Sequence, residues 1–359
     1  MPFGLKKKKS SKKLDRDSSV RGKSLSDRSP SSPQVPTFSD SERHDLNGGV
    51  SKAFKYAPSL SKVRIDLAGL PINVFGLKEL TPVPARASAP PPPEVCAIIH
   101  MHGRCGDADG EEKIVRQLWD KVERLKMQAG GQDQRDCIIV NFDARNHGHR
   151  MTNKDGQLAW KQGNTRHALD LYGMITGTAR DVSFIVDFLA PYLFPHDERN
   201  ISAFAVTGKS LGGHSVWHVL AEEPRITVGV PFIGMPDYSK LLQDRTRTSF
   251  VSNGPPTVPA SLKNLISSID PAMKQFDVFD PSKNPFWGKK VCVCSGREDR
   301  LVKWDWNQGF LNALVLGEPN SRGGMDGLRV VLVDNVGHEV TEHMVEEAGD
   351  WIWRWSICI

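Results

Sequence analysis

One stretch of the chain combines a hydroxyl nucleophile with the small residues that a tight turn needs. Ser210 stands between Gly208 and Gly212, after an apolar run and before a segment with the composition of a helix. A serine on such a strand-to-helix turn is lifted out of the sheet, and the first backbone N–H groups of the helix can stabilise negative charge beside it. The pattern predicts attack by Ser210 on a carbonyl group, with the N–H of Leu211 as one donor to the oxyanion.

A serine hydroxyl is a weak nucleophile until a base takes its proton, and the base in turn needs a carboxylate to orient it. His338 and Asp299 each follow an apolar run that we expect to be a buried strand. Because ligands gather at the carboxyl ends of parallel strands, both should lie near Ser210. The sequence therefore predicts a triad in the chain order Ser210, Asp299, His338. Asp237, after another apolar run, stays open as the acid, and His338 could instead be satisfied by backbone groups at the start of a helix.

Alternating strands and helices are expected to position these residues. Continuous apolar runs are typical of buried strands, and apolar residues three and four apart are typical of helices. Together they predict an α/β fold with a mostly parallel central sheet covered by helices on both faces. The expected strands are 63–67, 72–77, 95–99, 137–141, 201–206, 227–233, 290–294 and 328–333, the first two forming a hairpin, and the expected helices are 114–127, 168–193, 215–223 and 341–355.

The alternating pattern is interrupted between the strands at 227–233 and 290–294. Residues 234–287 are rich in Pro, Ser, Asp and Lys and contain only short helical pieces. An insertion of this size usually forms a lid or cap over the site, so we expect it to roof the pocket. The alternative is that the insertion lies on the surface of the domain without covering the site.

The first 55 residues are basic, rich in serine and nearly free of apolar side chains. Because such a segment cannot offset its ordering entropy, we predict a disordered tail over residues 1–55 and one domain over 56–359. Residues 1–50 carry 11 Lys and Arg against 6 Asp and Glu, and 11 − 6 gives +5, which equals the formal charge of the whole chain. The folded part is therefore close to neutral, and a nucleic-acid partner is not expected.

The protein is expected to be located in the cytoplasm. No apolar segment follows the basic cluster as in a secretory signal, and no apolar run reaches the length of a transmembrane span. Four of the six cysteines fall in expected buried strands, as is usual in an intracellular protein. The basic tail could be a solvated leader, contact an anionic surface or engage the import machinery, which would give nuclear access.

Two histidine pairs, at 100–102 and 147–149, have a spacing seen in metal-dependent hydrolases. Neither pair is followed by the Asp-His continuation expected of a binuclear zinc site. We therefore expect no metal and no cofactor.

Three segments together resemble the α/β-hydrolase superfamily of serine hydrolases. They are Gly208–Gly213 around the nucleophile, Gly296–Val302 around the acid, and Gly337-His338. The resemblance covers about Val63–Trp355 and implies the α/β-hydrolase fold. It also implies that a small-molecule carboxylic ester or thioester is cleaved through an acyl-enzyme.

His102-Gly103 resembles the oxyanion loop of this superfamily, which implies the backbone N–H of Arg104 as a donor beside that of Leu211. The substrate is accordingly expected near His102, Gly103 and Lys209. Arg104 and Cys105 stand where lipases and esterases of one type have glycines, which leaves the exact donor open. Cys105 is also an alternative nucleophile, although no base is assigned to it.

Two further segments carry the resemblance. Asp143–Gly148 is similar to a turn that braces the pocket in this superfamily, and the charged leader together with His167–Met174 resembles uncharacterised fungal members. The same acyl-enzyme could pass to an alcohol or amine, or be formed from a peptide or amide. An acyltransferase, a peptidase or amidase, and a hydrolase-like binding module without catalysis therefore stay open.

Overall fold

An eight-stranded sheet organises the part of the chain that the computed structural model describes, which is residues 60–83, 92–130, 133–318, 321, 324 and 326–359. These residues belong to one compact unit, Phe54–Ile359. The predicted tail, residues 1–55, lies outside the described residues. The strands are β1 (Lys62–Leu67), β2 (Leu70–Phe75), β3 (Glu94–Met101), β4 (Asp136–Phe142), β5 (Asn200–Lys209), β6 (Ile226–Phe232), β7 (Lys290–Gly296) and β8 (Leu328–Val333).

The strands lie in the order β1-β2-β4-β3-β5-β6-β7-β8. β1 and β2 form the predicted hairpin, and β2 pairs with β4 in the antiparallel sense. All other neighbouring pairs are parallel. The carboxyl ends of β3 to β8 therefore lie at one edge of the sheet, where the loops that carry the candidate site residues begin.

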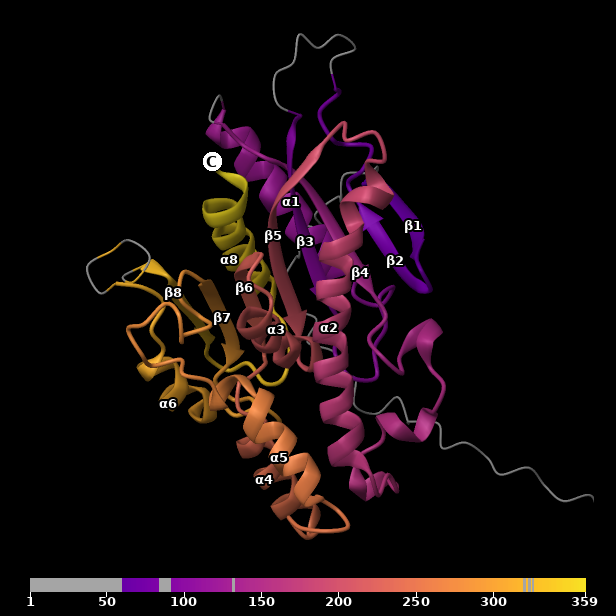
Figure 1. The fold of residues 1–359 in the computed structure, drawn as a ribbon, viewed down its shortest axis with the longest axis vertical. Helices are drawn as coiled ribbons and strands as arrows, with labels where there is room; N and C mark the ends of the chain where they lie inside the picture. Colours follow the sequence, from indigo (N-terminus) through magenta and orange to yellow (C-terminus); the bar gives the residue numbers. More distant parts are fainter. Residues whose placement is uncertain (1–59, 84–91, 131–132, 319–320, 322–323, 325) are drawn as a thin grey trace, which may run out of the picture. The chain divides into compact units, whose positions relative to one another are not determined.

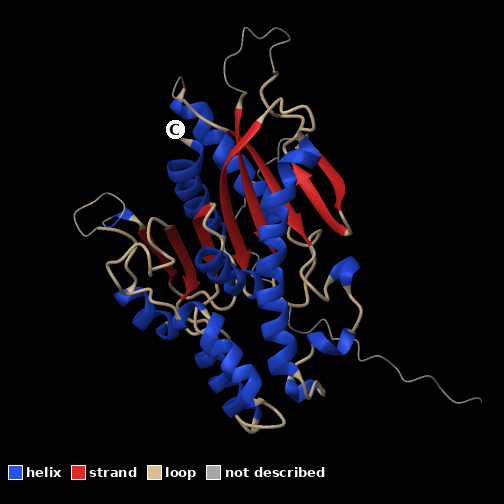
Figure 2. Cartoon of the chain, viewed as in Figure 1, coloured by secondary structure: helices blue, strands red, loops and turns tan. Residues whose placement is uncertain are grey.

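Helices cover both faces of the sheet, as the sequence predicted (Figures 1 and 2). α1 and α8 pack together on one face, and α2, α3 and α6 cover the other. The helices are α1 (Glu112–Ala129), α2 (His167–Leu193), α3 (Leu211–Glu222), α4 (Tyr238–Ser249), α5 (Ala260–Ile269), α6 (Asp305–Ala313) and α8 (Glu342–Ile352). The last helix was predicted to run on to residue 355, but it changes at Trp353 into a π-helical turn, Trp353–Ile357.

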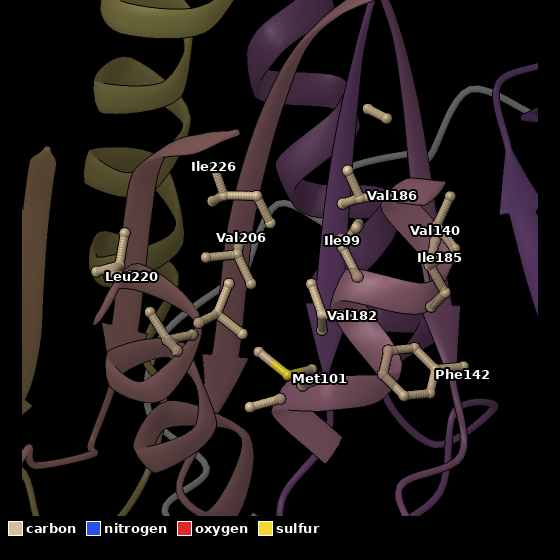
Figure 3. Close-up of a cluster of buried hydrophobic side chains, with 14 of the residues drawn as sticks. Ile99, Met101, Val140, Phe142, Val182, Ile185, Val186, Val206, Leu220 and Ile226 are labelled. Atoms are coloured by element: carbon tan, nitrogen blue, oxygen red, sulfur yellow. The ribbon is translucent and has the colours of Figure 1, made fainter. Parts of the chain in front are cut away.

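The central strands are apolar on both sides because both of their faces are buried. Alternate residues of β3 show this: Ile98 packs towards α1 and α8, whereas Ile99 packs towards α2 and α3. In the cluster on the second face, side chains of β3, β4 and β5 meet those of α2 and α3 (Figure 3). Four cysteines, Cys96, Cys137, Cys292 and Cys294, are buried in strands as predicted.

The segment between β6 and β7, residues 234–287, contains α4 and α5, and we call it the cap. Both helices extend beyond the carboxyl edge of the sheet, beside the first half of α2 (Figure 1). Their apolar residues form one cluster with that half of α2, including Tyr172 of α2 and Leu241 of α4. None of the helices that the structure describes is long and apolar enough to cross a membrane.

Candidate active site

The turn from β5 to α3 holds Ser210 in a backbone conformation that L-residues rarely adopt, with φ 53° and ψ −106°. The neighbouring glycines allow this turn. A Cβ on Gly208 would lie 2.5 Å from the carbonyl oxygen of Gly212, and a Cβ on Gly212 would collide with the backbone of Met101. Strain of this kind persists only where the surrounding structure enforces it, and it occurs often at functional sites. The elbow expected from the sequence is thus present.

The three side chains of the expected triad come together in a hydrogen-bonded chain. Ser210 Oγ lies 2.8 Å from Nε2 of His338, and Nδ1 of His338 lies 2.6 Å from Oδ2 of Asp299. Because a carboxylate can only accept, Nδ1 carries the proton and Nε2 is the acceptor for the serine hydroxyl. The carboxylate of Asp299 is buried, and its other oxygen accepts the N–H groups of Leu301 and Val302 at 2.8 and 2.9 Å.

The alternative acid, Asp237, has another place in the fold. Its side chain caps the start of α4 by accepting the N–H of Lys240 at 3.0 Å. His338, for its part, lies before α8 and bonds to two side chains rather than to the helix backbone. Geometry therefore favours Asp299 over Asp237 as the partner of His338.

Two backbone N–H groups lie beside Ser210 without a protein acceptor in the described part of the chain, those of Leu211 and Arg104. Leu211 opens α3, where the helix dipole favours negative charge. The carbonyl of Gly103 accepts from His102 Nδ1 at 2.7 Å and from the N–H of Gly106 at 3.1 Å. Since the C=O and N–H of one peptide point in opposite directions, the N–H of Arg104 points away from the His102 ring. Neither N–H group is thus taken up by an acceptor among the described residues.

The loop that carries Arg104 passes close to the nucleophile. A Cβ on Gly103 would lie 3.6 Å from the Cβ of Ser210, and the N–H of Gly212 donates to the carbonyl of His102 at 3.1 Å. Cys105 follows with φ 65° and is exposed, and the one hydrogen bond of its thiol to a described residue goes to the carbonyl oxygen of Gln157, at 3.9 Å. The structure thus brings no base to the alternative nucleophile.

The predicted brace links this loop to the turn after β4. Asp143 accepts the N–H of Ala108 at 2.9 Å and that of His149 at 2.7 Å, and Nε2 of His102 accepts the N–H of Ala144 at 2.8 Å. Burial is the main cause that lowers the pKa of His102, so the ring is neutral. Its Nδ1 can therefore donate to the carbonyl of Gly103 while its Nε2 accepts the N–H of Ala144.

Lys209, which directly precedes the nucleophile, forms an ion pair. Its Nζ lies 3.0 Å from Oε1 of Glu111, and Oε2 of that buried carboxylate lies 3.5 Å from Nε2 of His100. Burial alone would raise the pKa of Glu111, but His100 and Lys209 outweigh it and lower the pKa to about 2. Nothing in the sequence around Glu111 indicates this role, because the residue directly precedes a helix, α1, that is rich in charged side chains.

The histidine pairs at 100–102 and 147–149 are held by other groups. His100 Nδ1 bonds to the hydroxyl of Thr207 at 2.7 Å, and His147 and His149 bond through Nδ1 to the carbonyl of Arg145 and to Asp143. In the described ranges, no three His, Cys, Asp or Glu side chains gather as metal ligands.

No protein-family model matches the sequence, and no curated protein matches it. Solved structures, however, superpose on most of the chain. A protein of Thermus thermophilus does so with a TM-score of 0.55 and 18% identity, over 83% of this chain and 98% of its own. Prolyl oligopeptidase B of Galerina marginata, bound to a 35mer hydrolysis and macrocyclization substrate, superposes with a TM-score of 0.51 and 14% identity. The match covers 84% of this chain and 37% of that one. For an esterase of Pyrococcus furiosus the TM-score is 0.47 and the identity 16%, over 83% of this chain and 93% of that one.

The chain has the α/β-hydrolase fold. The strand order, the helices on both faces and the insertion between β6 and β7 confirm the fold class that the sequence predicted. At this level of identity the similarity concerns the fold alone. The resemblance to fungal members and the division of the chain after residue 55 stay predictions.

Proposed function

We propose that this protein is a serine hydrolase that cleaves a carboxylic ester or thioester of a small molecule through an acyl-enzyme on Ser210. The observation that carries the proposal is the chain of hydrogen bonds from Ser210 through His338 to Asp299, at 2.8 and 2.6 Å. A binding module has no need of this chain, nor of a serine held at positive φ beside it.

In the proposed reaction, Ser210 Oγ attacks the substrate carbonyl while His338 Nε2 takes its proton. Asp299, fixed by two backbone N–H groups, keeps the proton on Nδ1 and stabilises the imidazolium. The N–H groups of Leu211 and Arg104 hold the oxyanion of the tetrahedral intermediate. His338 then protonates the leaving group, and the same steps with water as nucleophile release the acid and restore Ser210.

The cap is proposed to roof the site. Its apolar cluster includes Leu211, next to the nucleophile, and Val302, whose N–H binds Asp299. Residues of the cap would therefore contact the substrate close to the scissile bond. A cytoplasmic location, with nuclear access through the basic tail, stays a prediction from the sequence.

The test is labelling of the full-length protein with a fluorophosphonate probe, with the modified peptide located by mass spectrometry. Wild type should be labelled on Ser210, and Ser210→Ala and His338→Ala should lose labelling and turnover of p-nitrophenyl esters by about 10⁴-fold or more. Labelling on Cys105, or equal turnover by Ser210→Ala, would contradict the mechanism.

A further inference from the structure

A guanidinium group lies on the buried face of the cap, beside the proposed triad. Leu241 and Leu242 of α4 belong to the same apolar cluster as Leu211 and Val302. Arg245 follows them by one helical turn and thus lies on the same face of α4. This face is the one that looks towards the nucleophile and the acid.

No carboxylate in the described part of the chain forms an ion pair with Arg245, although the charges of Asp244 and Asp299 act on it from a greater distance. Its Nε is shielded from solvent and has no hydrogen-bond partner. Its neighbour Asp244 pairs instead with Arg247 at 2.7 Å and with Lys303 at 3.5 Å. Burial lowers the pKa of Arg245 and the charge of Arg104 adds to this effect, whereas Tyr238, Asp244 and Asp299 act in the opposite direction without outweighing it. Because a shielded charge without a partner is unfavourable, the position is suited to an anion that arrives with the substrate.

The side chain of Arg104 is a second guanidinium group that acts on Arg245. Its Nη1 donates to the carbonyl of Gln157 at 2.8 Å, and no described carboxylate pairs with it. Burial, followed by the charges of Arg245 and Arg104, lowers the pKa of His167 to about 4, so both cations act on this one side chain at the start of α2. Arg245 also adds to the effect of burial on His214, in the first turn of α3. Both arginines therefore lie within electrostatic reach of the start of α2, and Arg245 also lies within reach of the first turn of α3.

We infer that Arg245, assisted by Arg104, binds a carboxylate group of the substrate, so that the protein acts on esters or thioesters that carry a second, negatively charged group. The inference rests on the proposed function for the identity of the reacting bond. Nε and the adjacent Nη of a guanidinium form two parallel donors that match the two oxygens of a carboxylate. His167 and His214 are neutral at pH 7, so the two arginines supply the positive charge of this region.

The first test measures binding and does not depend on catalysis. Adipate is titrated into full-length wild type, Arg245→Gln, Arg245→Lys and the control Arg247→Gln, which changes an exposed arginine of the same helix. Wild type and Arg247→Gln should bind adipate, Arg245→Gln should lose about tenfold or more in affinity, and Arg245→Lys should be intermediate because it keeps only the charge. Equal affinity in Arg245→Gln, no binding by wild type, or binding of inorganic phosphate but not adipate would overturn the inference.

The second test compares turnover of the mono-p-nitrophenyl ester of adipic acid with that of the same ester methylated at its free carboxyl group. The readout is the ratio of the two kcat/KM values, because a general disturbance of the cap cancels in it. The ratio should fall about tenfold or more in Arg245→Gln, chiefly through KM, and hold in Arg247→Gln. An unchanged ratio in Arg245→Gln overturns the inference. Absence of turnover and of Ser210 labelling in wild type would contradict the proposed function instead, and adipate binding would still decide the role of Arg245.

Discussion

The Nδ1 atom of His102 lies 2.7 Å from the carbonyl oxygen of Gly103, so the residue that opens the oxyanion loop also fixes the peptide that follows it. The other ring nitrogen accepts the N–H of Ala144 at 2.8 Å, in the turn after β4. A single neutral ring thus ties the loop to a neighbouring strand end and orients the N–H of Arg104.

Replacing His102 should therefore reduce catalysis without removing the nucleophile. In His102→Ala the Gly103 carbonyl keeps only the N–H of Gly106 as a donor, at 3.1 Å, so the peptide is held less firmly and we expect kcat to fall about 10²-fold, with a much smaller change in KM. His102→Asn, which can still donate to the Gly103 carbonyl, should recover part of kcat. Steady-state kinetics on a p-nitrophenyl ester measure this split. An unchanged kcat in His102→Ala would contradict the role of His102 in orienting the N–H of Arg104.

Asp299→Asn should lower kcat by about 10⁴-fold while Ser210 stays in place, because the amide no longer fixes the proton on Nδ1 of His338. Fluorophosphonate labelling should be slowed by a similar factor. Asp237→Asn is the matched control: Asp237 caps α4 at 3.0 Å, and its loss should cost stability of about 1 kcal/mol or less. If Asp237→Asn abolished labelling and Asp299→Asn did not, the two acids would have to exchange roles.

Gly208→Ala should disrupt the elbow. Its new Cβ would lie 2.5 Å from the Gly212 backbone, which cannot move away without displacing α3. We expect a loss of about 3 kcal/mol or more in the free energy of unfolding, together with loss of labelling. Gly173→Ala in α2 meets nothing within 4 Å and should instead stabilise the protein by about 0.5–1 kcal/mol. Chemical denaturation of both variants measures the contrast, and a stable, labelled Gly208→Ala protein would disprove it.

The sheet, and the meeting of Ser210, Asp299 and His338 at its edge, could be predicted from the sequence because each rests on local signals. A strand buried on both faces must be apolar throughout, and the groups at its carboxyl end meet those of its neighbours. Ser210 follows β5 and Asp299 follows β7, whereas His338 follows the less buried edge strand β8; all three lie at the same edge of the sheet, so their meeting follows from the topology.

The cap could not be predicted at the same level. Helix α4 has few apolar residues, and tertiary packing of Leu241 and Leu242 holds it. Arg245 lies in a sequence that reads as polar and exposed, so nothing local marks it as shielded. The role of Glu111 could not be predicted either. It depends on the ion pair with Lys209, and the two residues meet only because β3 and β5, which are far apart in the sequence, pair in the sheet.

The base of the cap contains a buried carboxyl group that should make stability depend on pH. Burial, with the nearby charge of Asp237 adding to it, raises the pKa of Asp270 to about 8. Between about pH 4 and 8 the folded protein therefore keeps a proton at Asp270 that the unfolded chain has lost. Unfolding releases that proton, so the contribution of Asp270 to stability falls as pH rises through this range, by at most about 1.4 kcal/mol per pH unit.

Asp270→Asn should remove this component of the pH dependence. The amide can satisfy only one of the two N–H groups, of Tyr238 and Ala272, that now donate to the carboxyl oxygens, so stability near pH 5 should fall. Between pH 5 and 8.5, however, the free energy of unfolding should decline less steeply than in wild type. Asp280→Asn, at an exposed site, is the control and should keep the wild-type slope. Denaturant unfolding at a series of pH values measures the slopes, and parallel curves for wild type and Asp270→Asn would show that Asp270 is already ionised in the folded protein at pH 5.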